Sequence, residues 1–128
     1  MHHCMVESLH ERDMLADLGD TMDTGFSFAF QPIVALRTMQ IVGQEALVRG
    51  LDGESAGSVI AAIRSDNLYW FDQACRMRAI NTAIRIGIEQ DLHLNCSQIT
   101  PANLQHTLQS TRSTAIQAGI HPGRIVLE

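Results

Sequence analysis

The chain has 128 residues, of which 45% are hydrophobic, and its formal net charge at pH 7 is -5. This length suffices for one domain with a real core, and the apolar runs are too short to cross a membrane. The acidic balance argues against a DNA- or RNA-binding surface, which needs a basic patch. Three cysteines, at positions 4, 75 and 96, show no paired spacing, so we expect a cytoplasmic protein.

The first half of the chain predicts a helix and then two strands. Apolar residues at helical spacing indicate a helix over residues 7–22, within an N-terminal tail and helix that occupy residues 1–25. Alternating apolar residues predict strands over 26–35 and 40–49, with a turn between them. A loop rich in glycine, aspartate and serine follows the second strand, and a short helix is expected over 56–64.

The second half predicts helices alternating with strands. A long helix over 67–86 should end at Gly87, with a stripe of apolar residues on its buried side: Leu68, Phe71, Cys75, Ala79 and Ile86. A strand is expected over 91–97 and another over 124–128. Between them, Thr100-Pro101 predicts a helix start, with Leu104, Leu108 and Ala115 buried and Gly119 at the end. This order indicates a mostly parallel α/β sheet.

Polar side chains gather where the predicted strands end. Glu45, Leu47 and Arg49 share one face of the second strand, and Asn95 and Glu128 lie near the carboxyl ends of the next two. In an α/β barrel this end of the strands holds the active site. Carboxylate and amide oxygens favour Mg²⁺, Mn²⁺ or Ca²⁺ over Zn²⁺, and a metal beside an arginine suits a phosphodiester. Taken singly, Asn95 also fits a turn residue and Glu128 a solvated carboxylate.

Several short motifs, in this order along the chain, resemble the EAL domain family, the bacterial cyclic di-GMP phosphodiesterases. The motifs are Gln31-Pro32-Ile33, Glu45-Ala46-Leu47-Val48-Arg49, Ala74-Cys75-Arg76, Asn95-Cys96-Ser97 and Arg124-Ile125-Val126-Leu127-Glu128. The resemblance covers the chain from about Asp13 to its last residue. It implies that residues 26–128 form an incomplete EAL domain, about half of a (β/α)8 TIM-like barrel with an antiparallel first strand.

The resemblance also implies roles for single residues. Glu45, Asn95 and Glu128 would be ligands of Mg²⁺ or Mn²⁺, and Arg49 would hold a phosphate oxygen of cyclic di-GMP. Gln31 and Leu47 would line the nucleotide site, although plain packing explains Leu47 equally well. The implied reaction is hydrolysis of cyclic di-GMP to linear pGpG by a metal-activated water.

Two departures from the family pattern matter. The segment after Arg49 lacks the usual His-Pro-x-x-Gly loop and is more similar to EAL domains linked to BLUF photosensors. The family's Asp-Asp pair, catalytic lysine and final glutamate would follow Glu128, so we expect the chain to be inactive alone. It would need the C-terminal half of a barrel or a second copy of itself. The alternatives are an inactive cyclic di-GMP receptor, a protein-interaction module, or a barrel fragment without ligand.

Overall fold

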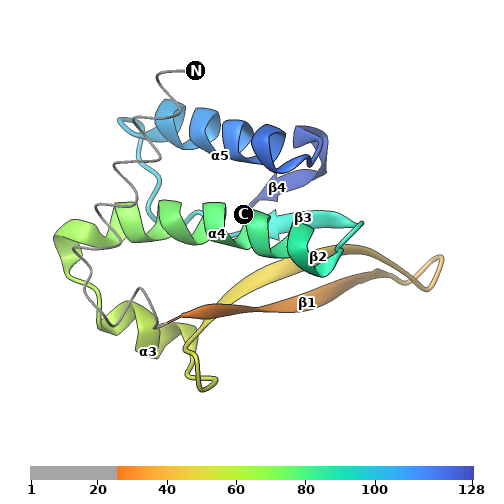
Figure 1. Cartoon of the computed structure of the whole chain (residues 1–128), viewed down its shortest axis with the longest axis horizontal. Coiled ribbons are helices and arrows are strands. Elements are labelled where there is room, and N and C mark those ends of the chain that lie inside the picture. The colour runs from red at the N-terminus through yellow and green to blue at the C-terminus, as the bar shows by residue number, and fades with distance from the viewer. Residues whose placement is uncertain (1–25) are drawn as a thin grey trace.

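A computed structural model of the chain describes residues 26–128, so the predicted tail and helix of residues 1–25 lie outside the described residues. Strands and helices alternate along the described part (Figure 1). The elements are β1 (Ser27–Ala35), β2 (Gln40–Arg49), α3 (Ala56–Ala61), η1 (Ser65–Asn67), α4 (Leu68–Ile86), β3 (Asp91–Leu94), α5 (Leu104–Ala118), η2 (Pro122–Arg124) and β4 (Ile125–Leu127).

The four strands form one open sheet in the order β1-β2-β3-β4. The pair β1-β2 is antiparallel and the other two pairs are parallel. This arrangement confirms the predicted α/β fold, a partial TIM-like barrel with an antiparallel first strand. Within residues 26–128, no helix is long and apolar enough to cross a membrane.

Helix α4 packs on one face of the sheet and forms the main core. Its C-terminus is capped by Gly87, whose φ of 82° is the left-handed conformation that glycine adopts most readily. The predicted apolar stripe is wrong at Ile86, which is 57% exposed because it is the last helical residue and the chain turns away there. The core consists of alanines and branched residues from the sheet, from both long helices and from the residue after the cap of α5: Ala46, Ala79, Ile80, Ala83, Leu92, Leu94, Ala115 and Ile120.

Helix α5 differs from its prediction in both its start and its buried side. It begins at Leu104, because the side chain of Asn103 accepts a hydrogen bond from the Thr100 amide and holds the preceding residues in a turn. Leu104 and Leu108 are 43% and 46% exposed. The buried side is largely polar, comprising Thr107, Ser110, Thr111, Thr114 and Ala115.

Three of the hydroxyl groups on the polar side of α5 are satisfied within the helix, whereas the buried Thr111 hydroxyl has no partner among residues 26–128. Thr107, Ser110 and Thr114 each donate a hydrogen bond to the carbonyl oxygen four residues earlier. The small hydroxyl side chains also let α5 lie close to α4 beside the sheet (Figure 1).

The later strands are shorter than predicted. Strand β3 ends at Leu94 and β4 at Leu127, and the short helix α3 ends at Ala61. The hydrogen-bond ladder nevertheless continues one step, because Glu128 donates to the Leu94 carbonyl and Cys96 donates to the Glu128 carbonyl, each at 2.9 Å. This extension holds Asn95 and Glu128 beside one another, immediately after their strands.

Candidate functional site

A row of side chains crosses the sheet on the face opposite to the α4 core. In the strand register Gln31 lies beside Glu45, Glu45 beside His93, and His93 beside Val126. Neighbours in register point to the same face of a sheet, whereas the adjacent Ala46, Leu92 and Leu94 point into the core. The row therefore places a carboxylate and an imidazole side by side on the second face.

The carboxylates of Glu45 and Glu128 meet on this face. Burial raises the pKa of Glu45 above its usual value, and the neighbouring charge of Glu128 and a hydrogen bond with it raise this pKa further. The charge of His93 acts in the opposite direction and lowers it. Two carboxylates in such contact repel one another when both are ionised, so a bound divalent cation would stabilise the pair.

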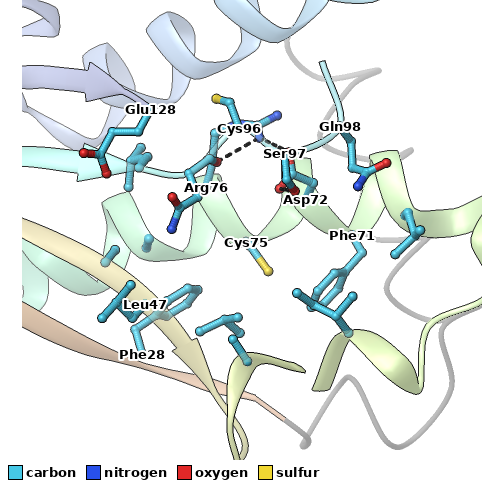
Figure 2. Close-up of a pocket in the computed structure, with 18 residues that line it drawn as sticks. Phe28, Leu47, Phe71, Asp72, Cys75, Arg76, Cys96, Ser97, Gln98 and Glu128 are labelled. Atoms are coloured by element: carbon cyan, nitrogen blue, oxygen red, sulfur yellow. Dashed lines mark hydrogen bonds and ion pairs between the residues drawn. The ribbon is translucent and has the colours of Figure 1, made fainter. Parts of the chain in front are cut away.

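A pocket of about 400 Å³ opens beside these strand ends (Figure 2). Leu47, Asn95 and Glu128 line it together. Its opposite wall is largely apolar and comes from β1, α3 and α4, with Phe28, Ile60, Phe71 and Cys75 among its members. The pocket thus joins an apolar hollow to a carboxylate and an amide, an arrangement typical of ligand sites.

A buried arginine fixes the backbone at the rim of this pocket. Arg76 is 2% exposed, and its guanidinium donates hydrogen bonds to the Asp72 carboxylate, to the Gln73 side chain and to the main-chain oxygen of Asn95. Ser97 also donates to Asp72 at 3.2 Å (Figure 2). Helix α4 therefore holds the segment after β3 in position through an ion pair and its hydrogen bonds.

The fold has close parallels among solved structures. The c-di-GMP-bound form of a standalone EAL protein from Vibrio cholerae is 41% identical to this chain, with a TM-score of 0.71 over 82% of this chain and 44% of that one. The described part of the chain has the EAL domain fold. It spans less than half the length of the Vibrio protein.

Two further structures have the same EAL fold. BlrP1 from Klebsiella pneumoniae, in a manganese and cyclic di-GMP complex, is 25% identical over 80% of this chain and 26% of that chain, with a TM-score of 0.69. The FimX EAL domain from Xanthomonas citri is 19% identical over 96% of this chain and 51% of that chain, with a TM-score of 0.63, and shows the fold alone. No protein-family model and no curated protein matches the chain.

The EAL triplet itself is divided between the two faces of β2. Ala46 is buried in the core, whereas Glu45 and Leu47 lie on the other face. Leu47 contributes to the pocket, and Glu45 contacts Glu128. The small alanine fits where the strand approaches α4, so the triplet combines packing on one side with the site on the other.

Gln31 lies on β1 and Arg49 on β2, and both side chains lie apart from the pocket. Gln31 is exposed on β1, opposite Glu45 in the register. Arg49 is half-buried at the end of β2, where its Nη1 donates to the main-chain oxygen of Val48 at 2.8 Å. Neither residue lines the pocket among the residues that the structure describes. The structure therefore brings Glu45 against Glu128 and Asn95 beside Glu128, and leaves Arg49 at the edge.

The two cysteines in the described part are poor metal ligands and nucleophiles. Burial and the charge of Asp72 raise the pKa of Cys75 to about 12, and burial raises the pKa of Cys96. Residues 26–128 contain no cluster of three or more His, Cys, Asp or Glu side chains placed to hold a metal ion. The oxygen donors that the site offers are the Glu45 and Glu128 carboxylates and the Asn95 amide.

Sequence reasoning missed two residues of this candidate site. Arg76 belongs to a recognised motif, but its contact with Asn95 was not anticipated, although the i,i+4 spacing of Asp72 and Arg76 on a helix was a signal. His93 was placed on the same strand face as Asn95 without a role. Its Nδ1 lies 3.6 Å from Glu128 Oε2.

Proposed function

We propose that this chain forms the metal- and nucleotide-binding part of a cyclic di-GMP phosphodiesterase, which hydrolyses cyclic di-GMP to linear pGpG. The observation that carries the proposal is the contact between Glu45 and Glu128 at the carboxyl ends of the sheet, beside a ligand-sized pocket. The proposal is also supported by the 41% identity of the chain to a c-di-GMP-bound EAL protein.

Glu45, Asn95 and Glu128 would hold Mn²⁺ or Mg²⁺. Their donor set is made of oxygens, which suits these hard cations. Complexes of the Klebsiella protein with manganese and with calcium are in keeping with this choice. The metal, when bound, supplies charge stabilisation of the phosphoryl group and an activated water.

The remaining residues would bind and orient the nucleotide. Arg49 would release the Val48 carbonyl and pair with a phosphate oxygen, for which the planar guanidinium is well suited. Gln31 and Leu47 would contact the nucleotide from β1 and β2. The second half of the barrel, supplied by further polypeptide or by a second copy, would complete the site in the cytoplasm.

The test is incubation of the chain, alone and mixed with the C-terminal half of an EAL barrel, with cyclic di-GMP and Mn²⁺ or Mg²⁺, with chromatography for the linear product. Glu45→Gln removes the ligand charge at nearly constant shape, and Glu89→Gln, at an exposed position outside the site, is the matched control. Product that is lost only in Glu45→Gln supports the proposal. Saturable cyclic di-GMP binding without product in the mixed sample favours the receptor alternative. Neither binding nor product in that sample refutes both functions.

A further inference from the structure

His93 occupies the centre of the site, yet the proposed function gives it no role. Its side chain is 20% exposed and lies in register between Glu45 and Val126. Its Nδ1 atom is buried, has no hydrogen-bond partner among residues 26–128, and lies 3.6 Å from Oε2 of Glu128. A buried polar atom without a partner is costly, so its presence beside a carboxylate calls for a physical reason.

Gly43 leaves room for this imidazole on the neighbouring strand. A Cβ atom added at Gly43 would lie 3.0 Å from both Cδ2 and Nε2 of His93, closer than ordinary van der Waals contact. The missing side chain therefore lets the ring lie against β2, with its Nδ1 edge toward β4 and Glu128. This close approach limits how far the ring can turn away from the carboxylate.

We propose that His93 is a positioning residue, whose Nδ1–H donates to the Glu128 carboxylate and orients it for the metal ion. The inference rests on the proposed function, since it assumes that Glu128 is a ligand. Carboxylates that bind metals are commonly oriented by such hydrogen bonds, and removal of the donor weakens metal binding.

The geometry favours this role over direct ligation by His93. The distance of 3.6 Å is too long for a hydrogen bond, but a side-chain shift of under about 1 Å closes it. Such contacts are often long before a ligand binds. Across residues 26–128 no three His, Cys, Asp or Glu side chains are placed as joint ligands, so His93 does not complete a set with Glu45 and Glu128.

Calorimetric titration of the full chain with Mn²⁺ tests this role. His93→Leu, which removes the donor, is expected to raise the dissociation constant for Mn²⁺ roughly tenfold. His93→Asn retains an N–H donor near the Nδ1 position and should restore most of the affinity. His121→Leu, at the exposed histidine that caps η2, is the matched control, and thermal unfolding of each variant accounts for any loss of stability.

A metal-free measurement separates the two proposals. In ¹⁵N NMR spectra of the imidazole ring, His93 should be the Nδ1–H tautomer, and its signal should shift in Glu128→Gln. Wild-type chain that binds no Mn²⁺ would refute the proposed metal site, while the tautomer still decides whether His93 donates to Glu128. Wild-type binding that is unchanged in His93→Leu, or an Nε2–H tautomer, would refute the role of His93 alone.

Discussion

The guanidinium of Arg76 donates a hydrogen bond to the main-chain carbonyl oxygen of Asn95, with an N–O distance of 3.3 Å. The same guanidinium forms an ion pair with Asp72, four residues earlier on α4. The backbone of a proposed metal ligand is therefore held by a side chain of the core. Stability and site geometry are coupled at this point.

Replacement of Arg76 by leucine should strongly destabilise the chain. The change leaves the Asp72 carboxylate partly buried without its cation, and breaking a buried ion pair costs about 3–5 kcal/mol. Urea unfolding measures the loss. Arg64→Ala is the control, because the Arg64–Asp66 pair is exposed and such pairs contribute less than about 1 kcal/mol. Equal effects of the two substitutions would contradict the structural role of Arg76.

Replacement of Glu45 by glutamine should stabilise the metal-free chain at neutral pH. Because the pKa of Glu45 is raised in the folded state, the folded chain loses stability as the pH rises above 4.5 and this group ionises. The gain in Glu45→Gln should be largest at pH 7 and disappear as the pH falls below 4.5. The size stays below about 1 kcal/mol, since solvent screens the pair.

Mn²⁺ should reverse the effect of Glu45→Gln on stability, so that the wild-type chain becomes the more stable of the two. Thermal unfolding with and without Mn²⁺ is expected to show that the ion raises the Tm of the wild-type chain and leaves that of Glu45→Gln unchanged. A variant that is less stable than the wild type at pH 7 without metal would mean that Glu45 and Glu128 do not repel one another.

Cys75 should resist alkylation in the folded chain. Its pKa of about 12 keeps the thiol protonated at pH 8, and only the thiolate is nucleophilic. Mass spectrometry after treatment with iodoacetamide should show slow modification of Cys75 in buffer and rapid modification in urea. Fast labelling of the native chain at this residue would contradict its buried position.

The hydrogen bond between Gln73 on α4 and Ser110 on α5 should contribute to the free energy of unfolding. Gln73 donates a hydrogen bond to the Ser110 hydroxyl in the buried contact between these helices. Ser110→Ala leaves the Gln73 amide without this acceptor and should cost about 1–3 kcal/mol of unfolding free energy. Ser113→Ala, three residues along the same helix, should be close to neutral in the same urea experiment.

The open sheet should make the chain associate. Strands β1 and β4 are the two edges of the described sheet, and unpaired edge strands favour pairing with another chain. Sedimentation velocity over a range of concentrations should show a mass that increases with concentration. A compact monomer that unfolds cooperatively at every concentration would contradict this expectation.

Local sequence patterns determined β1, β2 and the long helix α4, because side-chain alternation and helical spacing are properties of neighbouring residues. The glycine ends of α4 and α5 were predictable for the same reason, since a left-handed cap needs glycine. The motifs also indicated the EAL resemblance and the carboxylate and amide candidates. The start of α5 was not predictable, because the hydrogen bond from the Thr100 amide to the Asn103 side chain holds residues 100–103 in a turn before the helix.

Only the tertiary structure decided which faces are buried and which site residues meet. The leucines of α5 face outward because α4 presents Gln73, which needs a hydroxyl partner rather than an apolar one. The contact of Glu128 with Glu45 and His93 depends on the parallel pairing of β2, β3 and β4. That pairing joins residues more than thirty positions apart, and no local pattern encodes such a distance.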